Sequence, residues 1–418
     1  MRIIFHIDVN SAFLSWSALK QLEEQPGSVD LRTIPSAVGG DVLTRHGIIT
    51  AKSIPAKKYG IKTGEPVVKA LQKCPELVLV RSDFETYRRC SKTFIAILRS
   101  YTGQVEQVSI DEAFVDVTDL LPKGEKALVR KEAERLADRI RERVKTELGF
   151  TVNAGISENK LLAKMASDFA KPDRTHTLYP EEVPAKMWPL PIRDLFGCGQ
   201  ATAGKLIQMG ITTIGEAART DPAILKSVLG EKGGEYLYRS ANGLGSDRVH
   251  TEQEEAKGYS NETTMPFDIT EANYRKEMPP VLSHLAEKVA GRLARDGVYA
   301  KTVGVMVKTD DFRRRSRQRS LAQSTNGREE IKKEAAALMD ELLLPPNGLF
   351  AEHTGIRLVG VSCTNLDHGE YRQMNLLEWQ AENAERRKES ERSKKLDEMM
   401  RKIREKHGEN AVKRGDGL

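Results

Sequence analysis

Residues 107–117 have the sequence Gln107-Val108-Ser109-Ile110-Asp111-Glu112-Ala113-Phe114-Val115-Asp116-Val117. Apolar and polar residues alternate here at the period of a β-strand, so we expect a hairpin with two acids near its turn. A second apolar run, residues 2–9, predicts a buried strand with Asp8 near its end. In a split βαβ sheet two such strands can lie side by side, which would bring Asp8, Asp111 and Glu112 to one edge.

The segments around the hairpin alternate between helical and strand patterns. Helices are predicted over residues 12–22, 85–101, 124–148 and 157–171, and strands over residues 77–81 and 150–155. Gly149 is the expected stop of the third helix, while Ser157 is the expected cap and Pro172 the expected end of the fourth. This order indicates an α+β fold with a split βαβ core.

The chain changes in character after Pro172, and four further regions can be distinguished. Residues 173–245 predict short helices, residues 246–256 a polar linker, residues 257–367 a second α+β region, and residues 368–418 a mostly charged tail. In the second α+β region, helices are predicted over residues 279–296 and 328–344, and strands over residues 301–308 and 355–362. At about 150 residues per domain, a chain of 418 residues suggests roughly three domains.

The composition is that of a folded globular protein, since 39% of the residues are hydrophobic and 30% are charged. Lysine and arginine outnumber the acids by six, an excess too small to identify a polyanionic partner by itself. No apolar run approaches the roughly 18–20 residues that a membrane span needs, so no membrane association is expected. The four cysteines form no CxxC pair, so we expect neither a zinc knuckle nor a disulfide framework, and we expect a reducing, cytoplasmic location.

Three carboxylates at one sheet edge would repel one another, and each would push the others toward protonation. Divalent cations resolve this conflict, because Mg²⁺ prefers oxygen ligands and keeps positions open for substrate phosphates. Two such ions about 3.5–4 Å apart stabilise the attacking and leaving oxygens of a phosphoryl transfer. The sequence therefore predicts a magnesium site formed by Asp8, Asp111 and Glu112, and the alternative is a set of acids that are simply solvated at the surface.

Three longer segments extend this interpretation: Phe5-His6-Ile7-Asp8-Val9-Asn10-Ser11-Ala12-Phe13, Ser109-Ile110-Asp111-Glu112-Ala113-Phe114, and Ala154-Gly155-Ile156-Ser157-Glu158-Asn159-Lys160 through Ala170-Lys171-Pro172. In this order and spacing they resemble the Y-family translesion DNA polymerases, in particular the polymerase IV-like enzymes, with some polymerase V-like features. The resemblance covers residues 1 to about 365 and implies a multi-domain right-hand polymerase. The implied domains are a palm at residues 1–10 and 80–172, fingers at 11–79, a helical thumb at 173–245 and a little finger at 257–367.

The resemblance also implies roles for the residues at the expected sheet edge. Asp8, Asp111, Glu112 and the carbonyl of Val9 match residues that bind two Mg²⁺ ions, with Mn²⁺ as an alternative metal. One ion is expected to lower the pKa of the primer 3′-hydroxyl and the other to hold the triphosphate. Lys171 matches a lysine that contacts the triphosphate, although a lysine at a helix C-terminus is also common because it complements the helix dipole.

Phe13 matches the steric gate of the family, a ring under the sugar that leaves no room for a 2′-hydroxyl, and its alternative role is that of an ordinary core residue. The neighbouring aromatic residue that is frequent in the family is Ala12 here, while Ile54 and Lys57 stand where a tyrosine and an arginine are usual. Lys57 keeps the positive charge but loses the bidentate fork. We therefore expect a looser grip on the nucleotide and, because Ala12 buttresses Phe13 less, weaker discrimination against ribonucleotides.

Two features indicate DNA binding. The sequence around Gly197 and Gly199 resembles a helix-hairpin-helix, in which glycines let backbone N–H groups approach a phosphate, and the alternative is a packing corner between helices. Five arginines without interleaved acids follow the strand predicted over residues 301–308, namely Arg313, Arg314, Arg315, Arg317 and Arg319. We expect them to contact DNA phosphates, and the alternative is a solvated surface loop.

Residues 373–377, with the sequence Gln-Met-Asn-Leu-Leu, resemble the short motif that binds the bacterial sliding clamp. In this motif Gln373 comes first, and Leu376 and Leu377 are the apolar anchors that enter a groove of the partner. The alternative is the start of a helix that packs on the little finger.

Together these patterns predict a monomeric, template-directed DNA polymerase of the translesion class, which binds primer–template DNA and adds an incoming dNTP to the primer 3′-hydroxyl. One alternative is a non-catalytic scaffold that binds DNA or a clamp and has a degenerate palm. Another is a nucleotide cyclase, which would act without a primer–template. The intact acids at positions 8, 111 and 112 favour the polymerase.

Overall fold

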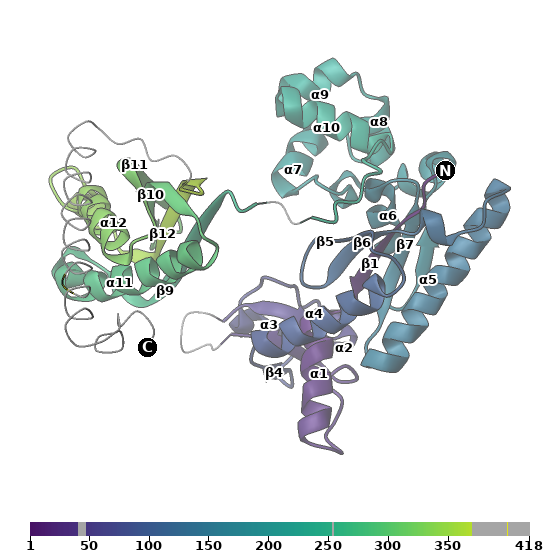
Figure 1. Ribbon diagram of the computed structural model, residues 1–418, viewed down its shortest axis with the longest axis horizontal. Helices are drawn as coiled ribbons and strands as arrows, with labels where there is room; N and C mark the ends of the chain where they lie inside the picture. The colour runs from purple at the N-terminus through teal and green to yellow at the C-terminus, as the bar shows by residue number, and fades with distance from the viewer. Residues whose placement is uncertain (41–46, 253–254, 370–398, 400–418) are drawn as a thin grey trace. The chain divides into compact units, whose positions relative to one another are not determined.

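The computed structural model describes residues 1–40, 47–252, 255–369 and 399. The chain separates into two compact units, Met1–Glu255 and Ala256–Leu418 (Figure 1). The first unit contains a five-stranded sheet, a three-stranded sheet and a group of short helices, and the second contains a four-stranded sheet. In the part of the chain that is described, no helix is long and apolar enough to cross a membrane.

The five-stranded sheet carries the residues of the expected metal site. Its order is β5-β6-β1-β7-β8, and its strands are β1 (Ile4–Val9), β5 (Val105–Gln107), β6 (Glu112–Asp116), β7 (Val152–Ser157) and β8 (Thr175–Thr177). β5 and β6 form the expected hairpin, with Asp111 and Glu112 at the end of its turn. β6 pairs antiparallel with β1, and Asp8 lies opposite Glu112. The prediction that the two acidic segments lie side by side is therefore confirmed.

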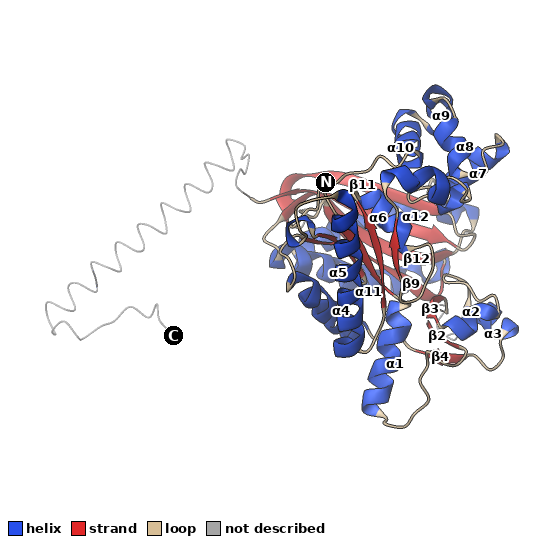
Figure 2. Ribbon diagram, turned by 90° about the vertical axis from the view of Figure 1, so that its right-hand side faces the viewer, coloured by secondary structure: helices blue, strands red, loops and turns tan. Residues whose placement is uncertain are grey.

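Helices cover both faces of this sheet (Figure 2). α1 (Ala12–Glu24), α4 (Phe84–Arg99) and α5 (Lys126–Leu148) pack on the face that carries Phe5 and Ile7. α6 (Lys160–Ser167) packs on the opposite face, which carries His6 and Phe114. This close approach depends on Gly155 of β7, because a Cβ atom there would lie 1.9 Å from the carbonyl oxygen of Ala163.

The helix predicted over residues 157–171 is shorter than expected. Ser157 pairs with Ile4 of β1, so it is the last residue of a strand and not a helix cap. Asn159 caps α6 instead, and its side chain accepts a hydrogen bond from the backbone N–H of Leu162. Because α6 ends at Ser167, Lys171 lies in the following loop, and the interpretation of Lys171 as a cation at a helix C-terminus is wrong.

The three-stranded sheet lies between α1 and α4 in the sequence. Its order is β3-β2-β4, and its strands are β2 (Ser36–Gly39), β3 (Ile49–Lys52) and β4 (Val78–Val80). α2 (Ile54–Lys58) and α3 (Val67–Lys73) pack with this sheet around a small core that includes Ile49 and Val67. This layer holds the segment with Lys52 and Lys57 beside the end of β1.

The remaining helices of the first unit are short, as the sequence predicts for residues 173–245. One of them, η2 (Thr118–Leu120), precedes this region, and the others are η3 (Pro180–Glu182), η4 (Val183–Met187), η5 (Ile192–Asp194), α7 (Gln200–Gln208), α8 (Ile214–Arg219), α9 (Pro222–Leu229) and α10 (Glu231–Ala241). Helices α7 to α10 share one hydrophobic core with α6, which contributes Leu162 and Met165. α6 therefore connects the five-stranded sheet to the helical group.

The second unit is a four-stranded antiparallel sheet with two long helices. Its order is β11-β10-β12-β9, and its elements are β9 (Gly258–Ile269), α11 (Glu271–Arg295), β10 (Tyr299–Thr309), β11 (Arg314–Thr325), α12 (Arg328–Leu343), η6 (Leu349–Glu352) and β12 (Ile356–Asp367). Both helices pack on the face formed by residues such as Val303, Val305 and Val361. α11 and α12 thus share one core with this face of the sheet.

α11 begins at Glu271 and not at Pro279, where the sequence predicts it to begin. Thr270 and Asn273 form a capping box at its true start. Tyr274 and Met278 are buried in the same core as Leu282, so the helix gains apolar contacts over its first two turns. This burial outweighs the backbone hydrogen bonds that Pro279 and Pro280 cannot make inside the helix.

Candidate active site

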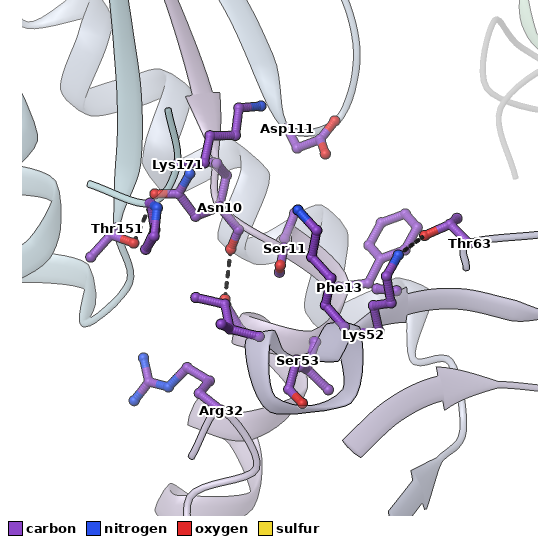
Figure 3. Close-up of a pocket in the computed structure, with 18 of the residues that line it drawn as sticks. Asn10, Ser11, Phe13, Arg32, Lys52, Ser53, Thr63, Asp111, Thr151 and Lys171 are labelled. Atoms are coloured by element: carbon purple, nitrogen blue, oxygen red, sulfur yellow. Dashed lines mark hydrogen bonds between the residues drawn. The ribbon is translucent and has the colours of Figure 1, made fainter. Parts of the chain in front are cut away.

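A pocket of about 550 Å³ opens where β1 ends and α1 begins. Asp111 and Lys171 lie at one end of this pocket and Arg32 and Ser53 at the other (Figure 3). The segment from β3 to α2 forms one wall, so the pocket lies between the five-stranded and the three-stranded sheets. Most of the residues that the sequence assigns to a substrate site, including Asp8, Ala12, Phe13 and Lys57, line this pocket.

The two strands that carry the acids are held together beside the pocket. The backbone N–H of Val9 donates a 2.9 Å hydrogen bond to the carbonyl oxygen of Asp111. Ser109 donates its hydroxyl to Oδ1 of Asp111 at 2.7 Å, which orients that carboxylate at the hairpin turn. These bonds fix the backbone of Val9 and Asp111 in one register.

Asp8 forms an ion pair with Lys171, whose ammonium group also lies 2.8 Å from a carboxylate oxygen of Asp168. Burial raises the pKa of Asp8 above its ordinary value, and the positive charge of Lys171 only partly offsets this effect. The negative charge of Asp111 makes a smaller contribution to the rise in this pKa. A cation placed between the carboxylates of Asp8 and Asp111 would stabilise the charged form of both.

Glu112 is held from the side of α6. Its Oε2 atom lies 3.2 Å from Nε2 of His6 and 2.5 Å from Nζ of Lys164. The hydrogen bond from His6 and, after it, the interaction with Lys164 lower the pKa of Glu112 to about 2, although burial acts in the opposite direction. Glu112 consequently stays negatively charged at any ordinary working pH.

The three carboxylates suit magnesium by their chemistry, since they offer only oxygen atoms and come from neighbouring strands. Within the described residues, however, no three His, Cys, Asp or Glu side chains stand together in a group that could hold an ion. Asp8 faces Lys171, and Glu112 faces Lys164 and His6. Asp8 and Glu112 are thus each paired with a lysine, whereas Asp111 accepts a hydrogen bond from Ser109.

Phe13 is held by a cluster of aromatic rings. It stacks on Tyr87 with the ring centroids 4.6 Å apart and an angle of 14° between the planes, and it meets the edge of Phe84 at 6.1 Å. Trp16 of the same helix lies 6.2 Å away. Ala12 is buried in the same hydrophobic core as Trp16 and Tyr87, but it adds no ring to this cluster. The support for Phe13 therefore comes mainly from α4, which the sequence did not reveal.

Lys52 is a basic residue of the pocket that the sequence analysis missed. It is the last residue of β3, and its ammonium group donates a 3.1 Å hydrogen bond to the hydroxyl of Thr63 (Figure 3). Burial lowers the pKa of Lys52, and the neighbouring charge of Lys57 lowers it further. The sequence did contain a signal for this role of Lys52. Lys52 stands only two residues before Ile54, which with Lys57 belongs to the segment that the sequence analysis compares with the family.

Two buried asparagines hold the loop that carries Lys171. Asn10 accepts a 2.9 Å hydrogen bond from the backbone N–H of Asp173, and it donates to the side-chain oxygen of Asn153 at 3.1 Å. Asn153 in turn donates to the carbonyl oxygen of Ala170 at 2.6 Å. The loop is thus bound on both sides of Lys171, and no local motif marks this role of Asn10 and Asn153.

The hairpin around Gly197 has the geometry that requires glycine at one position. Gly197 has a φ of 83°, and a Cβ atom there would lie 2.4 Å from the hydroxyl oxygen of Tyr236. Gly199 is the N-cap residue of α7, so it stands where free backbone N–H groups are expected. Tyr236 donates its hydroxyl to the carbonyl oxygen of Phe196 and closes the hairpin.

Four of the five arginines lie on the edge strand β11, Arg313 lies in the turn before it, and all five are exposed. Arg317 and Arg319 pair with Glu341 of α12, and Arg319 also pairs with Glu334. Arg313 and Arg314 lie 3.0 Å and 3.7 Å from Asp311 and Glu262. Asp311, which is near in the sequence, and Glu262, Glu334 and Glu341, which are distant, therefore offset part of this positive charge. Gln373, Leu376 and Leu377 lie outside the described residues.

Comparisons with known proteins agree with this architecture. The sequence model of the impB/mucB/samB family matches residues 7–168, and the model of its C-terminal domain matches residues 256–376. A model described as the thumb domain of DNA polymerase-iota matches residues 193–245. A solved Y-family DNA polymerase chimera has a similar fold, with a TM-score of 0.74 and 22% identity over 87% of this chain and 98% of that chain. The expected α+β polymerase fold is therefore confirmed.

Curated relatives match nearly the whole length of the chain. The DNA polymerase IV of Clostridium acetobutylicum is 39% identical over 416 residues, which cover 99% of this chain and 97% of that protein. The DNA polymerase IV 1 of Bacillus subtilis is 35% identical over 423 residues, which cover 100% of this chain and 93% of that protein. On these grounds the chain belongs to the impB/mucB/samB family and is a Y-family, DNA polymerase IV-like protein.

Proposed function

We propose that this chain is a template-directed DNA polymerase of the translesion class, which adds dNTPs to a primer 3′-hydroxyl. The observation that carries this proposal is the pairing of β1 with β6, which puts Asp8 opposite Glu112 beside a pocket lined by Phe13 and Lys171. Its relatives over the full length are named DNA polymerase IV, which supports the same activity.

The proposed domains follow the order of the elements along the chain. Residues 1–10 and 80–172 form the palm, residues 11–79 the fingers, residues 173–245 the thumb and residues 257–367 the little finger. The linker is residues 246–256 and the tail is residues 368–418. The match of residues 193–245 to a thumb-domain model supports the third of these assignments.

Asp8, Asp111, Glu112 and the Val9 carbonyl are the proposed ligands of two Mg²⁺ ions. When bound, these ions would supply activation of the primer 3′-hydroxyl and stabilisation of the pyrophosphate leaving group. The chain itself orients Asp111 through Ser109 and holds Lys171 near Asp8. Lys171 and Lys57 are proposed to bind the triphosphate, and Phe13 to contact the sugar.

Primer extension distinguishes this proposal from its alternatives. The polymerase is expected to add the complementary nucleotide to a primer on a template, and to stop adding it when a chelator removes divalent ions. A scaffold would bind the same DNA without extending the primer. A cyclase would consume nucleotide without a primer–template, and either result would overturn the proposal.

Lys52 is expected to contribute to triphosphate binding together with Lys57. Replacing Lys52 with methionine removes a charged hydrogen-bond donor worth about 1 kcal/mol, so the KM for dNTP is expected to rise about fivefold. Because the pKa of Lys52 is lowered, its charge is lost earlier than that of a free lysine as pH rises, and the difference in KM should shrink at alkaline pH. Steady-state incorporation of a single nucleotide at several pH values measures both effects.

Lys58 provides the matched control for this experiment. It is exposed on the same helix as Lys57, but unlike Lys57 it does not line the pocket. Lys58→Met is expected to leave the KM for dNTP unchanged. Equal KM values for Lys52→Met and Lys58→Met would remove the proposed role of Lys52.

The remaining interactions are proposed from the sequence and from local geometry. Gly197 and Gly199 are proposed to approach a DNA phosphate, and the cluster Arg313, Arg314, Arg315, Arg317 and Arg319 to contact the DNA backbone. Gln373, Leu376 and Leu377 are proposed to bind a bacterial sliding clamp. The monomeric state and the cytoplasmic location stay predictions.

A further inference from the structure

Glu112 is part of a buried polar cluster that lies between β1, β6 and α6. His6 is completely buried, its Nδ1 atom lies 2.8 Å from the hydroxyl of Ser167, and its Nε2 atom lies 3.2 Å from Oε2 of Glu112. Lys164 reaches the same Oε2 atom at 2.5 Å. Nothing in the described part of the chain forms a hydrogen bond or ion pair with the other oxygen, Oε1.

The geometry around Lys164 leaves its ammonium group little freedom. It lies 3.5 Å from Nε2 of His6 and 5.4 Å from the ring centre of Phe196, an aromatic residue of the glycine hairpin. The backbone N–H of Phe196 donates to the sulfur of Met165, which fixes the hairpin against α6. Lys164 is therefore confined between the carboxylate of Glu112 on one side and the ring of Phe196 on the other.

We propose that Lys164, supported by His6, is a positioning residue that holds Glu112 by Oε2, leaves Oε1 free for a divalent ion, and offsets the charge of the acidic site until that ion binds. This inference rests on the proposed polymerase function. Asp8 and Glu112 lie opposite each other on facing strands, so without cations their negative charges would repel each other. Lys171 pairs with Asp8 in the same way, so each of the two facing strands has an acid with its own internal cation.

Two lysines of α6 form a matched pair. Comparing them distinguishes an effect on the position of Glu112 from an effect on the stability of the fold alone. Lys160 lies one turn before Lys164 on α6 and pairs with Glu106 of β5 at 2.8 Å. The side chains of the two lysines are equally buried, with 17% and 16% of their surface exposed, and both pair with a glutamate of the same hairpin. The two lysines differ in their partners, because Glu112 is a proposed metal ligand and Glu106 is not.

Thermal unfolding of the whole chain with and without Mn²⁺, in the absence of nucleotide, tests the proposal directly. Lys164→Met and Lys160→Met are both expected to melt below the wild type in the presence of a chelator, because each loses a half-buried ion pair. Mn²⁺ is expected to raise the melting temperature of Lys164→Met more than that of the wild type, because the ion replaces the missing positive charge at Glu112. The rise for Lys160→Met is expected to equal that of the wild type.

Kinetics give the second readout. Lys164→Met is expected to lower kcat about tenfold, as is usual for a side chain that orients a metal ligand, with little change in the KM for dNTP. Lys164→Arg keeps the charge and is expected to restore most of the lost kcat. Lys160→Met is expected to leave both parameters unchanged.

The proposal is overturned if Mn²⁺ shifts the melting temperatures of the two methionine variants by the same amount, or if Lys164→Met keeps the wild-type kcat. If Lys164→Met does not fold, Lys164→Gln carries the same test, because glutamine keeps a donor for Glu112 without the charge. A wild type that extends primers while these variants behave alike would refute the positioning role and leave the polymerase function standing.

Discussion

Replacing Asp111 and Glu112 together with alanine is expected to reduce primer extension about a thousandfold or more. Metal ions supply several kcal/mol of charge stabilisation in phosphoryl transfer, and about 4 kcal/mol corresponds to a factor of about a thousand in rate. Both acids belong to the hairpin that faces β1, so the variant loses two of the three proposed carboxylate ligands at once. Single-turnover extension of a labelled primer measures the loss, and a DNA-binding assay is expected to show nearly unchanged affinity.

Asp116 supplies the control for this double substitution. It lies on the same face of β6 as Glu112, is partly buried, and its Oδ1 atom accepts a 3.0 Å hydrogen bond from the backbone N–H of Thr118. Asp116→Asn keeps this acceptor and is expected to retain wild-type extension. Extension by the Asp111→Ala/Glu112→Ala variant at a rate close to that of Asp116→Asn would contradict the proposed role of the two acids.

The sheet that carries these acids could be predicted from the sequence because its signals are local. The alternation in residues 107–117 marks the hairpin, and the apolar run before Asp8 marks the strand that pairs with it. Gly149 also ends α5 as expected, in the left-handed conformation that glycine adopts easily. Strand adjacency followed from the split βαβ arrangement and needed no contact information.

The partners of the charged side chains could not be predicted, because they depend on tertiary structure. Lys164 lies 52 residues from Glu112 in the sequence, and Arg319 meets Glu341 from the next helix across a distance of 22 residues. No periodicity or motif reports such pairs. The ends of α6 and α11 were misplaced for a related reason, since strand pairing of Ser157 and burial of Tyr274 override the local helix signals.

Phe13→Val is expected to raise the incorporation of ribonucleotides relative to deoxyribonucleotides about 100-fold. Excluding one small group by shape is worth up to about 3 kcal/mol, which sets the size of the effect. The ring of Phe13 is fixed against Tyr87 at 4.6 Å, so it cannot move aside to admit a 2′-hydroxyl. The ratio of kcat/KM for rNTP and dNTP, measured opposite the same template base, gives the discrimination directly.

Substitutions of Tyr87 distinguish the effect of the Phe13 ring on ribonucleotide discrimination from the effect of the ring that supports it. Tyr87→Leu removes the ring behind Phe13 and is expected to raise the relative incorporation of ribonucleotides by an intermediate factor of about ten. Tyr87→Phe keeps the ring and loses only the 2.8 Å hydrogen bond with Ser17, so it is expected to discriminate like the wild type. Because Ala12 is buried in the same hydrophobic core as Tyr87, with Phe13 packed against that core, enlarging Ala12 tests packing as well as gating. Discrimination in Phe13→Val that equals the wild type would show that Phe13 is an ordinary core residue, whose role is to pack with Trp16, Phe84 and Tyr87.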